Sequence, residues 1–338
     1  MTKILIIYTG GTIGMVNDPL TGALIPFDFK QIRQNVPELA RLNYQLDVHS
    51  FDPILDSSNM DPVIWAELAA IIERTYDDYD GFVVLHGSDT MAYTASALSF
   101  MLKNLSKPVV LTGSQLPIGE IRTDAKENLI TALEIVATKN GDRAMVPEVS
   151  IYFDYQLFRG NRAIKYNSEK FEAFRSPNYH ILAEAGVNLS FYSNYITELP
   201  LEEFRVQTSF NANIGVLKLY PGITVHAVKA ITESSVDAIV LETFGSGNTT
   251  TAEWFIDSLQ AALDRGKLIV DISQCQGGSV ELGKYETSKK LQQMGIISGF
   301  DMTFEATVTK LMYLMGLGLD NAEIAGLMEQ SIRGELTN

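Results

Sequence analysis

Short apolar runs alternate with longer amphipathic segments from Lys3 to about Thr138, and this alternation constrains the fold more than any other feature. Strands separated by amphipathic helices are typical of βαβ units and a parallel sheet. We therefore expect an α/β fold here. The candidate strands are Ile4–Tyr8, Leu46–Phe51, Phe82–Leu85 and Val109–Leu111.

Two helices are predicted between these strands. Asp61 and Pro62 supply an N-cap and a first-turn proline, and the apolar residues after them fall on one helical face. A second helix is expected over residues 90–105, before Lys107-Pro108. The apolar positions of both helices indicate packing on the sheet.

The chain has 338 residues, more than one hydrophobic core usually serves, which favours two domains. Residues 188–213 show no sustained period and are predicted to link a larger N-terminal catalytic α/β domain, 1–187, to a smaller C-terminal α/β domain, 214–338. In the second domain the alternation resumes, with strands expected at 214–220, 238–241 and 268–272 and helices at 225–231, 252–263, 303–315 and 322–330.

Composition narrows the classes of partner. The formal charge of −15 arises from 41 acidic and 26 basic residues, with no dense basic cluster, so we expect neither nucleic acid nor an anionic membrane as a partner. Cys275 is the only cysteine and the four histidines are scattered, so no metal site is predicted. The amino-terminal apolar run is too short for a signal-peptide core, which favours the cytoplasm.

Four polar loops follow the predicted strands, and ligands of open parallel sheets bind at such strand ends. None of these loops has the glycine order of a dinucleotide site or the Lys-Ser/Thr pair of a phosphate loop. Their hydroxyls and one carboxylate suit a small zwitterion, with Asp89 facing an ammonium and Ser57 and Ser58 a carboxylate. The loops are Thr9–Thr12, Asp56–Ser58, His86–Thr90 and Thr112–Gln115.

Two of these segments, Thr9–Gly14 and His86–Met91, resemble the two signatures of the bacterial L-asparaginase family, most closely its cytoplasmic type I branch. Matching stretches extend to Arg333-Gly334-Glu335-Leu336, so the resemblance spans essentially the whole chain. It implies hydrolysis of L-asparagine to L-aspartate and ammonia without a metal or an organic cofactor.

The resemblance also implies roles for individual residues. Thr12 would be the nucleophile that forms an acyl-enzyme, and Ser88, Asp89 and Lys165 would form a hydroxyl–carboxylate–amine triad; which hydroxyl attacks first is left open. Asn248 would come from a neighbouring chain of a homodimer or homotetramer. The implied substrate-binding residues are Asp56, Ser57, Ser58, Ser88, Asp89, Ser114 and Asn248.

The sequence departs from the family pattern at two places. Ser88 stands where the family usually has threonine, and Leu24 occupies the place of a tyrosine on the loop of residues 15–25, expected to be a lid, with Tyr8 as a nearby phenol. Three alternatives remain beside asparagine hydrolysis: a subunit of a transfer-RNA-dependent amidotransferase, a non-catalytic amino-acid sensor, and a preference for glutamine, which differs by one methylene.

Overall fold

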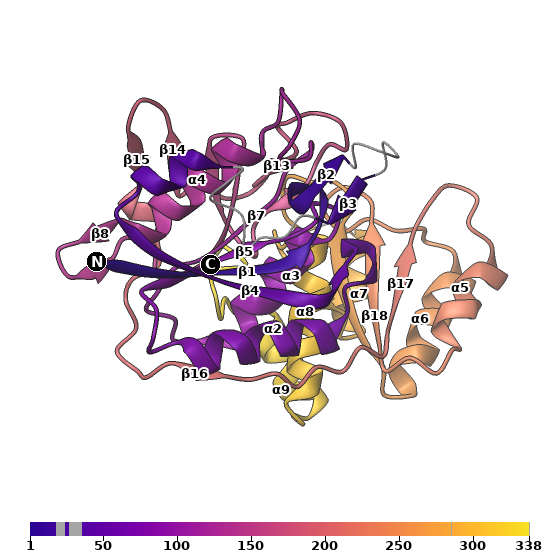
Figure 1. The fold of residues 1–338 in the computed structure, drawn as a ribbon. Coiled ribbons are helices and arrows are strands. Elements are labelled where there is room, and N and C mark those ends of the chain that lie inside the picture. The colour runs from indigo at the N-terminus through magenta and orange to yellow at the C-terminus, as the bar shows by residue number, and fades with distance from the viewer. Residues whose placement is uncertain (18–23, 27–35, 285, 338) are drawn as a thin grey trace. The chain divides into compact units, whose positions relative to one another are not determined.

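The computed structural model describes residues 1–17, 24–26, 36–284 and 286–337 and divides the chain into two units, Met1–Thr208 and Ser209–Asn338 (Figure 1). The first unit contains an eight-stranded mixed sheet in the order β15-β14-β11-β10-β7-β5-β1-β4. Its strands are β1 (Thr2–Gly10), β4 (Tyr44–Leu55), β5 (Gly81–Leu85), β7 (Val109–Thr112), β10 (Val149–Phe153), β11 (Gln156–Arg159), β14 (Ala183–Ala185) and β15 (Leu189–Phe191).

The parallel part of this sheet confirms the predicted α/β fold class. β4, β1, β5, β7 and β10 pair in parallel in that order, and each of the four predicted strands lies within one of them. Every residue of β5 and β7 is buried. Continuous apolar runs are characteristic of parallel strands because helices cover both faces of such a sheet.

The far edge of the sheet is antiparallel, which the strand-and-helix alternation did not predict. β10 turns directly into β11 through Asp154 and Tyr155, whose φ angles of 48° and 66° are left-handed. Two consecutive residues in this region form the tight hairpin that joins antiparallel strands, so no crossover helix is needed. β14 and β15 continue the sheet in the same antiparallel way.

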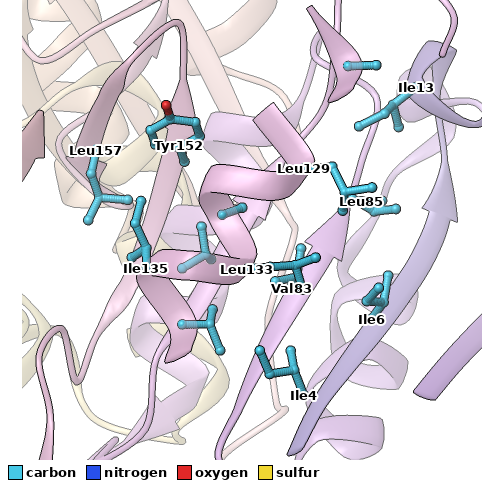
Figure 2. Close-up of a cluster of buried hydrophobic side chains, with 14 of the residues drawn as sticks. Ile4, Ile6, Ile13, Val83, Leu85, Leu129, Leu133, Ile135, Tyr152 and Leu157 are labelled. Atoms are coloured by element: carbon cyan, nitrogen blue, oxygen red, sulfur yellow. The ribbon is translucent and has the colours of Figure 1, made fainter. Parts of the chain in front are cut away.

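Among the described residues of this unit, three helices cover the sheet: α2 (Pro62–Thr75), α3 (Met91–Met101) and α4 (Ala125–Ala137). The Asp61 carboxylate accepts hydrogen bonds from the backbone N–H groups of Val63 and Ile64, which confirms the predicted cap. On one face of the sheet, Leu129 and Leu133 of α4 lie in the same buried cluster as Val83 of β5 (Figure 2). Burial of these side chains contributes about 25 cal/mol per Å² of apolar surface.

The prediction that α3 runs to residue 105 is wrong, because the helix ends at Met101. Leu102 and Lys103 form the short strand β6, which pairs with β16 (Arg205–Val206), and Asn104 has a left-handed φ of 57°. The segment expected to be a linker therefore contributes β15 and β16 to the first unit. The pairing of β16 with β6 is long-range, so the local sequence period carries no trace of it.

Short hairpins and 3₁₀ turns complete the first unit. β12 and β13 pair antiparallel with Lys165 opposite Phe174, as do β2 with β3 and β8 with β9. The elements are β2 (Met15–Asn17), β3 (Leu24–Pro26), β8 (Lys139–Asn140), β9 (Arg143–Ala144), β12 (Ile164–Lys165), β13 (Phe174–Arg175), η1 (Thr12–Gly14), η3 (Pro37–Arg41), η4 (Ser57–Asn59) and η5 (Ser193–Tyr195).

The second unit is a smaller α/β fold, as predicted, with a four-stranded parallel sheet in the order β17-β18-β19-β20. The strands are β17 (Ile214–Lys218), β18 (Ala238–Thr243), β19 (Leu268–Ser273) and β20 (Ile297–Ser298). The helices are α5 (Val225–Thr232), α6 (Glu253–Asp264), α7 (Glu286–Gln293), α8 (Phe304–Gly316) and α9 (Asn321–Met328). β20 and α7 were not predicted; β20 has only two residues, too few to show a period.

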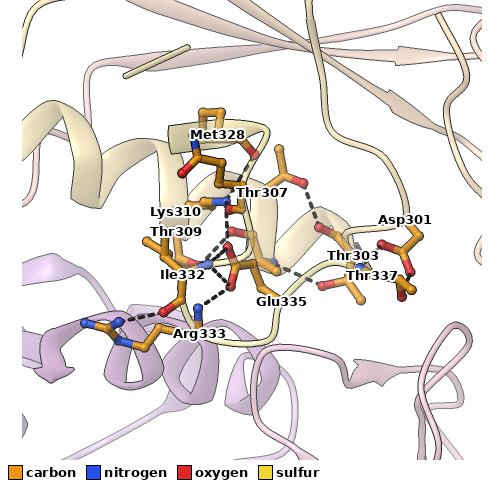
Figure 3. A network of polar contacts seen from close by, with 12 residues as sticks. Asp301, Thr303, Thr307, Thr309, Lys310, Met328, Ile332, Arg333, Glu335 and Thr337 are labelled. Atoms are coloured by element: carbon orange, nitrogen blue, oxygen red, sulfur yellow. Dashed lines mark hydrogen bonds and ion pairs between the residues drawn. The ribbon is translucent and has the colours of Figure 1, made fainter. Parts of the chain in front are cut away.

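A buried ion pair anchors the carboxyl-terminal segment of this unit (Figure 3). Lys310 and Glu335 are fully buried, and Lys310 Nζ lies 2.5 Å from Glu335 Oε1. The same ammonium donates to the carbonyls of Met328 and Gln330, at 3.1 and 2.6 Å. Within the described part of the chain, no helix is long and apolar enough to cross a membrane.

Candidate active site

The predicted loops meet at the carboxyl ends of the parallel strands in the first unit. Gly11, at the end of β1, has a φ of 91°, and a Cβ atom placed on it would lie 2.5 Å from Gly87 Cα. Only glycine permits this approach, because any side chain would collide with the backbone. Thr12 is half-buried at the start of η1. It is the residue after Gly11, so it lies beside the contact between the first loop and the loop that carries Ser88.

The Asp56–Ser58 loop packs against the same place. A Cβ atom on Gly87 would lie 2.6 Å from Ser57 Oγ, and Thr90 Oγ1 donates a 2.7 Å hydrogen bond to the Ser57 carbonyl. Ser57 is buried. Asp56 caps η4 by accepting from the Ser58 N–H at 2.8 Å, and this backbone hydrogen bond lowers the pKa of the carboxyl.

Ser88, Asp89 and Lys165 are brought into direct contact although Lys165 lies more than seventy positions further along the chain. Lys165 Nζ is 2.9 Å from Ser88 Oγ and 2.5 Å from Asp89 Oδ1. The lysine side chain is only 16% exposed, whereas that of Asp89 is 66% exposed. The hairpin of β12 and β13 supplies Lys165, and the buried Phe174 opposite it fixes the hairpin in the core. The arrangement joins a hydroxyl, a shielded amine and an accessible carboxylate.

The Thr112–Gln115 loop completes the set. A Cβ atom on Gly113 would lie 2.4 Å from the His86 carbonyl oxygen, so this loop also packs tightly on the second signature. Ser114 is buried and donates its hydroxyl hydrogen to the Leu116 carbonyl at 2.6 Å. Its oxygen lone pairs remain available to accept a hydrogen bond.

His86 is fully buried and supports the loop through contacts of both ring nitrogens. Its Nδ1 lies 2.6 Å from the Gly87 carbonyl and its Nε2 lies 2.9 Å from Thr94 Oγ1. Trp65 Nε1 donates to the same Thr94 hydroxyl at 3.0 Å. Burial lowers the pKa of His86 to about 4, so the ring is neutral at physiological pH. Sequence reasoning missed Trp65 and Thr94, because nothing local distinguishes them from other helical core residues.

The predicted lid is described only in part. Residues 18–23 and the side chains of Leu24 and Ile25 lie outside the described residues. Tyr8, the nearby phenol, is fully buried, and a Cβ atom on Gly14 would lie 2.0 Å from its hydroxyl oxygen. Burial raises the pKa of Tyr8 to about 12, so its phenol holds its proton at neutral pH.

Asn248 belongs to the second unit, in the turn that follows β18. Phe244 and Asn248 exchange backbone hydrogen bonds of 2.9 and 2.8 Å, which close the turn. Gly245 and Gly247 within it have φ angles of 53° and 110°. Among the described residues, no group of three or more His, Cys, Asp or Glu side chains could hold a metal ion.

Comparison with known proteins identifies the family. The model for the asparaginase N-terminal domain matches residues 3–197, and that for the glutaminase/asparaginase C-terminal domain matches residues 213–328. L-asparaginase 1 of Escherichia coli K12 is 42% identical over 336 residues, covering 99% of this chain and 98% of that protein.

Solved structures agree with this assignment. L-asparaginase I of Vibrio cholerae superposes with a TM-score of 0.91 at 41% identity, covering 100% of this chain and 99% of that one. The thermostable L-asparaginase of Thermococcus kodakarensis also gives 0.91, at 32% identity and 100% coverage of both chains. The chain belongs to the asparaginase family of amidohydrolases.

Proposed function

We propose that this protein hydrolyses L-asparagine to L-aspartate and ammonia. The observation that carries the proposal is the contact of Lys165 with both Ser88 and Asp89, beside the loop of Thr12. A hydroxyl needs a base to become a nucleophile, and a shielded lysine can act as one when its proton is removed. The similarity to the L-asparaginases of Escherichia coli and Vibrio cholerae supports the same substrate.

In the proposed reaction, Thr12 Oγ1 attacks the side-chain carboxamide carbon of asparagine. The carbon–nitrogen bond breaks, the nitrogen leaves as ammonia after taking up a proton, and an ester joins Thr12 to the aspartyl group. Water then hydrolyses this ester and restores the threonine. Lys165 takes the proton of the Ser88 hydroxyl during these proton transfers. The covalent intermediate is an advantage because it divides one difficult step into two easier ones.

The substrate is proposed to bind as a zwitterion. The Asp89 side chain is two-thirds exposed, and Lys165 contacts its Oδ1 atom. Its Oδ2 atom can therefore face the α-ammonium of the substrate. Ser57 and Ser58 would take the α-carboxylate, with Asp56 holding their turn and Ser114 completing the pocket. Glutamine is longer by one methylene, which changes binding by about 1–3 kcal/mol.

Thr12→Ala is the direct test. We expect turnover of asparagine to fall by about 10⁴-fold or more, because no acyl-enzyme can form, while aspartate still binds. Coupled ammonia release with asparagine and with glutamine measures both activity and preference. Wild-type protein that binds asparagine but releases no ammonia would indicate an amino-acid sensor instead, and unchanged turnover in Thr12→Ala would remove that residue from its role.

The proposal includes a homodimer or homotetramer in the cytoplasm, with Asn248 supplied by a neighbouring chain. Two inactive variants, Thr12→Ala and Asn248→Ala, test this together. If sites are shared, mixing the two under conditions of subunit exchange restores part of the activity, because some sites combine an intact Thr12 with an intact Asn248. A mixture that stays inactive although light scattering shows mixed oligomers would contradict shared sites.

A further inference from the structure

Asp271 lies in the sheet of the second unit, against the turn Phe244–Asn248. It is fully buried on β19, and a Cβ atom on Gly247 would lie 3.3 Å from Asp271 Oδ2. The turn is further held by Ser273, whose Oγ donates to the Gly245 carbonyl at 2.5 Å. The carboxyl group of Asp271 thus packs directly against the turn that carries Asn248.

The hydrogen bonds around Asp271 fit a carboxylic acid better than a carboxylate. Thr243 Oγ1 lies 2.7 Å from Asp271 Oδ1 and 3.3 Å from the Ile272 carbonyl oxygen, yet a hydroxyl has one hydrogen for these two acceptors. If Asp271 carries a proton, it donates to Thr243, and Thr243 donates to Ile272. Asp271 Oδ2 has no hydrogen-bond partner among the described residues, so a carboxylate there would be served by Thr243 alone.

The charged groups on the surrounding segments do not compensate a charge on Asp271. Glu242, next to Thr243 on β18, pairs with Lys218 at 3.0 Å, and its side chain points to the opposite face of the strand. Glu281, beyond Val280, pairs with Lys284 at 2.6 Å on the surface. The described ionisable side chains on α5, α6 and α7 are exposed: His226, Lys229, Glu253, Asp257, Asp264, Lys289 and Lys290.

Lys267, next to β19, is buried but donates to the backbone carbonyls of Ser234 and Val236. Asp301, which follows β20, accepts hydrogen bonds from Thr337, and on α8 Lys310 pairs with Glu335. Glu305 on α8 is half-buried and acidic, so it supplies no positive charge.

We propose that Asp271 is a positioning residue, held as a neutral carboxylic acid, that fixes the turn Phe244–Asn248 and thereby the side chain of Asn248. The inference rests on the proposed role of Asn248 in binding substrate. Ionisation places an uncompensated negative charge beside Gly247, and the turn shifts to admit water to it. Asparagine then binds less tightly, while the chemistry at Thr12 is untouched.

Burial agrees with this assignment, since it raises the pKa of Asp271 to about 7, although a Thr243 hydroxyl that donates to the carboxylate form lowers this pKa. The native protein therefore keeps a proton on Asp271 between about pH 4 and about pH 7, where the unfolded chain has lost it. The contribution of Asp271 to stability falls as the pH rises through this window and stays low above it.

The experiment compares wild-type protein with Asp271→Asn, which imitates the neutral acid, Asp271→Leu, which removes its hydrogen bond, and Asp257→Asn, a matched exposed control on α6. kcat and KM for asparagine are measured from about pH 5.5 to about pH 8.5, and Tm over the same range. Between about pH 5.5 and about pH 8.5, we expect the KM of the wild type to rise about threefold or more relative to that of Asp271→Asn. The pH dependence of kcat should be the same in both proteins. Asp257→Asn follows the wild type, and Asp271→Leu has a raised KM at every pH.

Tm provides a readout that does not depend on turnover. Asp271→Asn should gain stability relative to the wild type as the pH rises to about 7 and not beyond, because only the wild type must release a buried proton when it unfolds in that range. A Tm difference that is constant with pH overturns the neutral acid, and an identical pH course of KM in wild type and Asp271→Asn overturns the positioning role. A wild type that releases no ammonia at any pH refutes the proposed function and the role of Asn248, and the Tm series still decides the charge of Asp271.

Discussion

Two lysine–carboxylate pairs, one in each unit, share a contact distance and differ in almost everything else. Lys165 lies 2.5 Å from Asp89, and Lys310 lies 2.5 Å from Glu335. Asp89 is 66% exposed, so a ligand can reach it, whereas both members of the second pair have no exposed side-chain surface. Distance alone therefore does not distinguish the pair that we propose to be reactive from a structural one.

The remaining hydrogen-bonding capacity of each pair does distinguish them. Lys310 also donates to two carbonyls, and Glu335 accepts from the backbone N–H groups of Ile332 and Arg333. Burial lowers the pKa of Lys310, and the charge of Glu335 opposes this effect. Lys165 contacts a hydroxyl instead, which can exchange a proton with it. A pair with every site occupied can only hold the chain together, whereas a pair with a free oxygen and a hydroxyl can do chemistry.

Lys165→Met should give the largest effect and break the first pair. We expect kcat to fall by about 10²–10⁴-fold, the usual contribution of a positioned acid–base group, with Tm nearly unchanged because Asp89 stays solvated. Ammonia release and thermal unfolding measure the two effects. Near-normal turnover would show that Lys165 is not the base.

Lys310→Met should show the opposite pattern. Removing one member of a buried pair leaves an uncompensated charge on Glu335 and should lower the free energy of unfolding by about 3–5 kcal/mol. Urea denaturation measures this loss, and kcat of the remaining folded protein should change little. The double variant Lys310→Met/Glu335→Gln should recover part of the loss, and a double variant as unstable as the single one would mean that the charge is not the cause.

His86 extends the comparison to a buried group that has no ion pair. Its folded pKa of about 4 lies below the ordinary 6.5, so the unfolded chain takes up a proton first as the pH falls. Stability should decline between about pH 6.5 and about pH 4, by about 3 kcal/mol from this group. In His86→Asn that share of the decline should disappear, whereas the exposed control His226→Gln should behave as the wild type. Equal slopes in all three proteins would argue against a buried neutral His86.

Ser88→Thr should give the smallest effect and sharpens the description of the first pair. The added methyl group restricts χ1 and keeps the hydroxyl that Lys165 contacts. We expect kcat to change by about threefold or less, corresponding to under about 1 kcal/mol. Steady-state kinetics measures it, with Ser88→Ala as the comparison that removes the hydroxyl. A large loss in Ser88→Thr would indicate that the pocket is shaped around serine.

Much of the framework could be predicted from local sequence. The four apolar runs became parallel strands, and Asp61 with Pro62 began a helix, because period and capping are properties of neighbouring residues. The hairpin at Asp154 and Tyr155 was missed because Asp154 tolerates a left-handed φ, but a tyrosine follows it where glycine is the usual signal of such a turn. The pairing of β6 with β16 was missed because about one hundred residues separate the two strands.

By itself, the sequence determined the α/β class, the polar loops at the strand ends, and the two signatures that point to an amide hydrolase. The resemblance named Lys165 as the partner of Ser88, but only the tertiary structure brought the two into contact. Only the tertiary structure also showed that Lys310 is buried against Glu335 and where the buried carboxyl of Asp271 lies. The reason is physical. Periodicity and turn preference depend on adjacent residues, whereas the burial and pairing of a charge depend on segments that meet only when the chain has folded.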